Sequence, residues 1–185
     1  MRDSTIGGLI RDASAGDARA ADKLFSALYA ELHAIAERQL RGGEFTLGTT
    51  TLLHEAYLSI SAREGLEFAG RNQFLAYAAR AMRGLTIDHY RRRRRRKRGG
   101  GLEITALDDV PAVEPDTEPE KLSRLSAALD ALAQVDAPLA ELVDLHIFAG
   151  FTHEEIAAMR NVSERTVQRD WRKARLMLFD AVNRP

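Results

Sequence analysis

Apolar residues recur at intervals of three and four positions over most of the first hundred residues of this chain. Two such series are Leu24, Leu28, Leu32 and Ile35, then Leu52, Leu53, Ala56 and Ile60. This spacing places the apolar side chains on one face of an α-helix. We expect one helix, which Asp17 can cap, to continue through Leu24 to Leu40, and another to start at about Gln73. Strand-like alternation is nearly absent, and no proline precedes position 111. The pattern therefore predicts an all-α fold.

The composition changes after residue 98, from amphipathic helix to a segment rich in Gly, Pro and acidic residues. Segment 99–120 reads GGGLEITALDDVPAVEPDTEPE, a composition typical of a flexible linker. A new series of leucines at helical spacing starts at Leu122. We therefore expect two small helical domains, 1–98 and 121–185, joined by an acidic flexible linker at 99–120.

The formal net charge of zero is an average over unlike segments. Residues 1–98 hold 18 Lys and Arg against 11 Asp and Glu, whereas residues 99–137 hold 2 against 9. Residues 91–98 are eight consecutive cations, and 160–178 hold 6 cations against 2 acids. Two separated basic segments favour contacts with a polyanion at two places.

Several classes of function have little support in the sequence. The chain has no cysteine, and its five histidines show no metal-ligand spacing, so we expect no metal site and no cofactor. No glycine-rich phosphate loop is present, which argues against an enzyme and a small-molecule substrate. No apolar run approaches the ~18 residues that span a bilayer, and no signal-peptide pattern occurs. We expect a cytoplasmic protein that does not bind membranes.

The stretch THEEIAAMRNVSERTVQRDWRKARLML, residues 152–178, predicts a helix-turn-helix. Thr152 and Glu155 form a capping-box pattern at the start of a short helix. Asn161 stands where a left-handed turn residue is needed, and Ser163 can cap a second helix. In such motifs the second helix enters the major groove of DNA.

The expected second helix has one apolar face and one basic face. The apolar face is formed by Val167, Trp171, Ala174 and Leu178. The opposite face carries the candidate DNA-binding residues Arg165, Gln168, Arg169, Arg172 and Lys173. Arg and Gln can hydrogen-bond guanine and adenine edges bidentately. The alternative is a plain helical hairpin with a solvated basic face.

Two stretches outside this motif carry a family resemblance. FLAYAARAMRGLTIDHYRRRRRRKRGG, residues 74–100, resembles the promoter-melting helix of the extracytoplasmic-function (ECF) sigma factors, and HEAYL, residues 54–58, resembles their core-binding helix. Residues 148–178 resemble the second domain of the same family. The resemblance covers nearly the whole chain, with the motif blocks in the family's order.

The resemblance implies a factor that binds core RNA polymerase and promoter DNA. The first domain would bind the β′ clamp helices and open the −10 element, and the second would lie near the β flap and read the −35 element. The acidic linker would pass through channels of the polymerase. The residues implied in polymerase binding are Leu52, Leu53, Glu55 and Tyr57.

Candidate contacts to the −10 element lie in the 63–73 loop and the helix after it. They are Arg71, Asn72, Phe74, Arg80, Arg83, Arg91, Arg92, Arg94 and Arg95. The arginines neutralise phosphates, whereas the loop with Phe68 or Phe74 would hold an unstacked base. Phe74 is equally compatible with a place in the core, and Tyr77 is expected to be a core residue.

The chain departs from the family at the start of the core-binding helix. Family members carry acidic residues there, whereas this chain reads Gly48, Thr49, Thr50 and Thr51. One interpretation is that a threonine caps the helix. The other is a subgroup under the control of a Ser/Thr kinase, in which phosphorylation of Thr51, or of Thr50, supplies the missing negative charge.

A different class of function is a stand-alone helix-turn-helix regulator that does not bind polymerase. Such a regulator usually dimerises to read two half-sites, whereas a sigma factor acts as a single copy within the holoenzyme. A third is an adaptor that binds without initiating transcription. Co-purification with core polymerase followed by run-off transcription distinguishes them.

Overall fold

The computed structural model describes residues 2–41, 47–63, 65–99 and 118–183. The first half holds α1 (Arg2–Ser14), α2 (Ala18–Ala27), α3 (Tyr29–Leu40), α4 (Thr49–Ser61) and α5 (Arg71–Gly99). The second half holds α6 (Glu118–Val135), α7 (Ala137–Val143), the π-helix η1 (Asp144–Ala149), α8 (His153–Arg160) and α9 (Glu164–Asn183). The described ranges contain helices and no strand, which confirms the all-α prediction.

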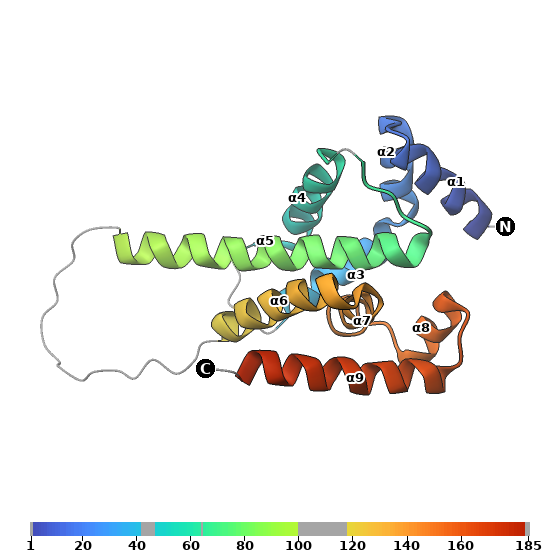
Figure 1. The fold of residues 1–185 in the computed structure, drawn as a ribbon. Helices are drawn as coiled ribbons and strands as arrows, with labels where there is room; N and C mark the ends of the chain where they lie inside the picture. Colours follow the sequence, from blue (N-terminus) through green and yellow to red (C-terminus); the bar gives the residue numbers. More distant parts are fainter. Residues whose placement is uncertain (1, 42–46, 64, 100–117, 184–185) are drawn as a thin grey trace, which may run out of the picture.

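In the first half, α3 and α4 pack against the long helix α5, which crosses the middle of the molecule (Figure 1). Asp17 starts α2 as expected, because its carboxylate accepts the backbone N–H groups of Arg19 and Ala20. The apolar stripes predicted from the sequence form the core. Fully buried members include Leu28, Leu32, Ile35, Leu52 and Ala56. Leu75 and Met82 of α5, which lie outside those stripes, are buried with them.

The expected continuous helix through residues 24–40 is broken at Leu28. This residue leaves helical geometry, with φ −106° and ψ 12°, and separates α2 from α3. Its side chain nevertheless stays buried. The apolar pattern therefore continues across the bend. The helix expected from about Gln73 begins slightly earlier, at Arg71.

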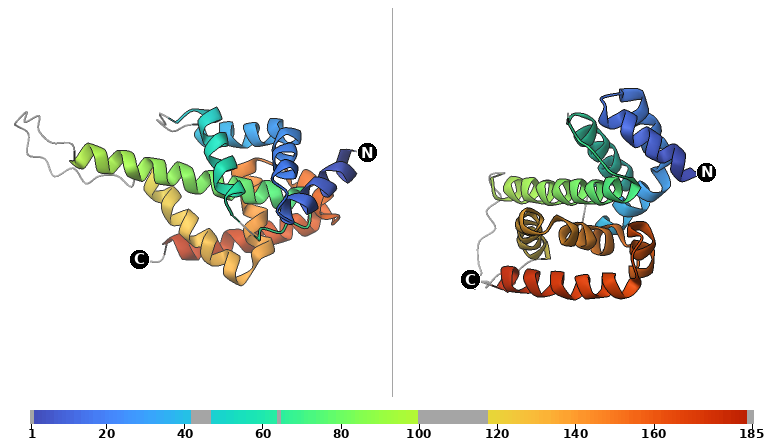
Figure 2. Two further views of the ribbon diagram at one scale, coloured as in Figure 1. Left: turned by 90° about the horizontal axis from the view of Figure 1, so that it is seen from above. Right: turned by 45° about the vertical axis from the view of Figure 1, so that its right-hand side comes forward.

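In the second half, α6, α7 and η1 lie between α5 and α9, and α8 closes one end (Figures 1 and 2). The buried residues of the second half include Leu129, Leu142, Leu145, Ile156, Val167 and Ala174. The two halves also contact each other. Helix α5 packs against both η1 and α6, and α3 packs against η1. The buried residues of both halves form one continuous cluster.

The expected linker falls mostly outside the described residues, which resume at Glu118. Helix α5 ends at Gly99 and α6 begins at Glu118, so both ends of segment 99–120 are helical. The division into domains 1–98 and 121–185 stays a prediction. What the structure adds is that the two halves are packed together.

Candidate nucleic-acid interface

The helix-turn-helix forms as the sequence predicts. The Thr152 hydroxyl accepts the Glu155 N–H at 3.1 Å, and the Glu155 carboxylate accepts the Thr152 N–H at 2.8 Å. Asn161 is left-handed, with φ 52°, and ends α8. The Ser163 hydroxyl accepts the Thr166 N–H at 3.2 Å at the start of α9. Local side-chain bonds thus fix the angle at which α9 is presented.

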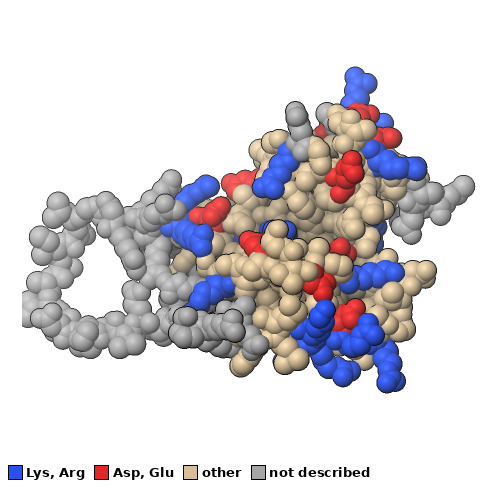
Figure 3. All heavy atoms as spheres, viewed as in Figure 1, with Lys and Arg blue, Asp and Glu red and all other residues tan. Residues whose placement is uncertain are grey.

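The basic face of α9 is exposed over its N-terminal half, where Figure 3 shows cationic side chains gathered. Arg165, Arg169, Arg172 and Lys173 are exposed, and Gln168 is partly exposed. Three of these side chains contact acids nearby. Arg169 pairs with Asp170 at 3.1 Å, Lys173 pairs with Asp136 at 2.9 Å, and the Gln168 amide donates to Glu164 at 2.9 Å.

Two histidines stack against each other beside Trp171 of α9, a contact that was not predicted from the sequence. The rings of His146 and His153 lie 4.4 Å apart, and both contact Trp171. The His146 Nδ1 atom lies 2.8 Å from the Phe151 carbonyl oxygen. Burial, and then the neighbouring His146, lower the pKa of His153. The cluster therefore belongs to the packing of η1, α8 and α9.

The arginines of α5 fall into two groups. Arg92 is exposed, as a contact to DNA phosphate requires. In contrast, Arg83 is only 1% exposed and pairs with Asp144 of the second half. Arg80 and Arg91 also bond to the second half. The side chains of Arg94 and Arg95 lie outside the described residues.

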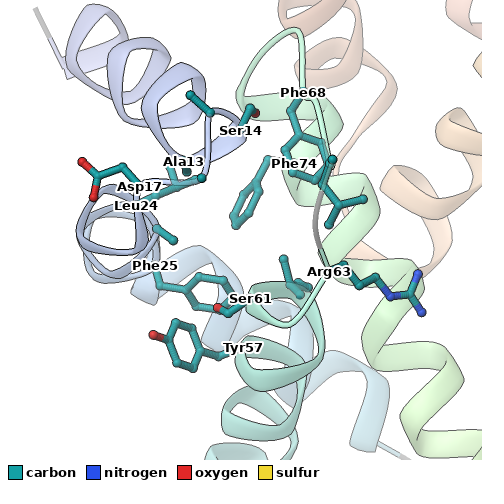
Figure 4. A pocket seen from close by; sticks show the side chains of 16 residues that line it. Ala13, Ser14, Asp17, Leu24, Phe25, Tyr57, Ser61, Arg63, Phe68 and Phe74 are labelled. Atoms are coloured by element: carbon teal, nitrogen blue, oxygen red, sulfur yellow. The ribbon is translucent and has the colours of Figure 1, made fainter.

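The loop before α5 lies over a cavity of about 500 Å³, shown in Figure 4. Phe25 and Phe68 each contact Phe74 edge to face, and Phe68 also contacts Tyr77. Phe74 is 1% exposed, so in this conformation it belongs to the core. The cavity nevertheless has aromatic walls, as a base-stacking site requires.

The other two loop candidates lie at the start of α5. Arg71 is partly buried and pairs with Glu31 of α3 at 3.0 Å, and Asn72 is partly exposed. Thus Arg71 supports the packing of α5 on α3 in this conformation. It is not a free cation.

The candidate polymerase-binding residues of α4 lie on different faces. Leu52 and Leu53 are buried in the core, so they position the helix and do not present a surface. Glu55 and Tyr57 are partly exposed. The Tyr57 hydroxyl donates to Asp22, and this hydrogen bond raises the pKa of Tyr57. Leu58, which the sequence did not single out, is 52% exposed on the same helix.

The threonines occupy the first turn of α4. Gly48 is the N-cap and makes no side-chain capping bond, so capping by a threonine is not what the structure shows. Thr50 and Thr51 are exposed, and Thr49 is partly exposed. The first backbone N–H groups of a helix lack intrahelical partners and attract negative charge.

Other kinds of site find little support in the described ranges. No group of three or more His, Asp or Glu residues there is placed to hold a metal ion. No helix in the same ranges is both long enough and apolar enough to cross a lipid bilayer.

Comparisons with known proteins agree with the nucleic-acid interpretation. No curated protein matches the chain significantly. A family model described as ECF sigma factor matches residues 3–184, a range that includes α4, α5 and the helix-turn-helix. Because this match covers nearly the whole sequence, the chain belongs to the ECF sigma factor family.

Proposed function

We propose that this chain brings core RNA polymerase to promoters, with α5 and the 63–73 loop contacting the −10 element and α9 reading the −35 element. Members of the family are DNA-binding transcription initiation factors and not enzymes. The assignment of α9 rests on one observation: α9 is the second helix of a helix-turn-helix with side-chain caps, and its basic face is exposed. The protein would act in the cytoplasm, where polymerase and promoters meet.

The exposure of each side chain indicates which contact it could make. Arg165 and Arg172 are available to base edges, Gln168 would first have to leave Glu164, and Arg92 is available to phosphate. On α4, Glu55, Tyr57 and the exposed Leu58 would contact the β′ clamp, with Leu52 and Leu53 holding the helix from behind. Segment 99–120 would serve as the acidic tether, and α8 with α9 would lie near the β flap.

Reconstitution with core polymerase tests the proposal. We expect co-purification with the core enzyme and run-off transcripts from a subset of promoters in a genomic library. Arg172→Ala should weaken promoter selection while leaving co-purification intact. Binding to duplex DNA as a dimer, with no affinity for polymerase, would instead indicate a stand-alone regulator.

We further propose that phosphorylation of Thr51, or of Thr50, by a Ser/Thr kinase controls binding to polymerase. A phosphate adds about −1.5 to −2 charges, which a helix N-terminus stabilises. What supports this is that both hydroxyls are exposed in the first turn of α4, where no acidic residue stands.

Matched substitutions test this control. Thr51→Asp should bind core polymerase at least about tenfold more tightly than Thr51→Ala, since one tenfold step needs only about 1.4 kcal/mol. The same pair at Thr50 ranks the two sites, and Thr49 serves as the neighbouring control. Full-strength binding by the unphosphorylated wild type would contradict the proposal without affecting the sigma-factor assignment.

A further inference from the structure

Three arginines on one face of α5 bond to one face of α6. Positions 80, 83 and 91 share a helical stripe, as do positions 123, 126 and 130. Arg91 donates to Ser123, Arg83 to Ser126 at 3.2 Å, and Arg80 pairs with Asp130 at 2.9 Å. The partners run in opposite order along two helices that point in opposite directions (Figure 1). The three contacts thus align α5 with α6 along a shared face and are not isolated pairs.

The middle arginine of this stripe is enclosed by the second half. The Arg83 guanidinium pairs with Asp144, lies 3.6 Å from Asp130, and stands 4.8 Å above the Phe148 ring. Asp144 and Phe148 both belong to the π-helix η1. Such segments are rare and are frequently found at functional sites. Here the π-helix presents an acid and an aromatic face to one cation.

A second contact closes the same interface from α3. Gly150 ends η1 in a left-handed conformation, with φ 84°, and a Cβ at this position would lie 2.1 Å from the Arg38 side chain. A side chain there would have to displace the Arg38 guanidinium, and the left-handed backbone itself favours glycine. The second half is therefore fitted to the surface of α3 as well as to α5.

We infer that this closed arrangement is an autoinhibited state, in which α6 and η1 occupy the α5 arginines that promoter DNA would bind. The inference rests on the proposed role of α5 in DNA binding. Phosphates would compete with Asp130 and Asp144 for Arg80 and Arg83, and with Ser123 for Arg91, so DNA and the closed contact exclude each other. Opening the two halves would then be a required step of promoter binding.

A charge reversal at the exposed Asp130 tests the contact without disturbing the core. Asp130→Lys places a cation against Arg80 and Arg83, so the halves should separate. Glu37→Lys on α3 is the matched control, because it makes the same charge change at an exposed site. The ion pair of Glu37 is with Arg41, the C-cap of the same helix, and not with the second half. We expect X-ray scattering to give a radius of gyration near the roughly 16 Å of a compact chain for wild type and control. Asp130→Lys should be clearly larger.

The same three proteins are then titrated with a labelled single-stranded oligonucleotide and the matching duplex, without polymerase. Asp130→Lys should bind about tenfold more tightly than wild type, the factor expected if one molecule in ten is open before the change. Glu37→Lys should show only the smaller gain that added positive charge brings. Opening without a gain beyond that control would overturn the inference.

A covalent lock provides the converse test, because the native chain has no cysteine. Arg91→Cys combined with Ser123→Cys places two thiols at one contact, and a short bis-maleimide can join them. The linked protein should bind the oligonucleotide at least about tenfold more weakly than the same unlinked protein. Equal binding by the two forms would overturn the inference. If Asp130→Lys stays compact or unfolds, the comparison of linked and unlinked protein still tests the inference. Scattering and locking need no polymerase, so a failed reconstitution would count against the proposed function alone.

Discussion

The ion pair between Arg83 and Asp144 joins the two halves at a buried position. Taking both charges out of water costs free energy that their attraction only partly offsets. Accordingly, burial raises the pKa of Asp144 to about 6, against the opposing effect of Arg83, and burial lowers the pKa of Arg83. Such a pair specifies how the halves meet more than it stabilises their contact, as suits a contact that must open.

The raised pKa of Asp144 predicts how the closed form depends on pH. An exposed aspartate titrates near 3.8, so between about pH 6 and pH 4 the closed form binds a proton that the open form does not. The closed form should therefore gain stability as the pH falls through this window, by roughly 3 kcal/mol for a difference of about two pH units. Titration of the wild type with the labelled oligonucleotide at a series of pH values measures this gain as weaker binding at lower pH.

Asp144→Asn is the control for this prediction, because the amide keeps the shape of the carboxyl group and does not titrate. The neighbouring charged groups, Arg83, Arg80 and Asp130, are unchanged. The variant should lose most of the pH dependence. If its oligonucleotide binding weakens on acidification as that of the wild type does, other groups are responsible and the assignment to Asp144 is wrong.

The sequence predicts the burial and contacts of a single residue well only where its partners are near in the chain. The buried face of α9 followed from spacing alone, and Val167, Ala174 and Leu178 are buried as expected. For Arg83, the same reasoning indicated a DNA contact. Its partners, Ser126 and Asp144, lie 43 and 61 residues away, and no local pattern connects them.

Helix starts in the second half depend on side-chain caps, and α8 has the fullest set. Thr152→Ala would leave N–H groups at the start of α8 without an acceptor and should lower the free energy of unfolding by about 1 kcal/mol. Urea unfolding followed by the emission of Trp171, the one tryptophan of the chain, measures this loss.

Thr152→Ser is the conservative control, since serine retains the hydroxyl and the capping bond. It should lie within about 0.5 kcal/mol of the wild type. An equal loss in both variants would mean that the methyl group of Thr152, and not the cap, stabilises this end of α8.

Side-chain caps made the starts of helices predictable, whereas a bend inside an apolar stripe could not be predicted. Asp17, Thr152 and Ser163 each start a helix where the sequence indicated. Leu28 breaks a helix without any signal, because its side chain fits the periodic pattern on both sides of the bend. The break is a result of packing in the core, which outweighs the local preference.

For the whole molecule, the charge distribution predicted two basic segments, but it did not predict that the second half would cover part of the first of them. Both were interpreted as DNA-binding surfaces, and the exposed face of α9 is compatible with that role. The face of α5, however, is partly covered by the second half. The same guanidinium groups suit phosphates and carboxylates alike, so composition could not distinguish a DNA contact from a contact within the chain.

Packing between the halves should make the closed protein unfold as one unit. Trp171 reports on the second half alone, whereas far-ultraviolet circular dichroism reports on every helix. In the wild type, and in Glu37→Lys, the two signals should change at the same urea concentration, as a two-state transition requires. In Asp130→Lys the halves lose their mutual support, so the two transitions should separate. Separate transitions already in the wild type would mean that the interface contributes too little to couple the halves, and that the closed form is at most a minor state.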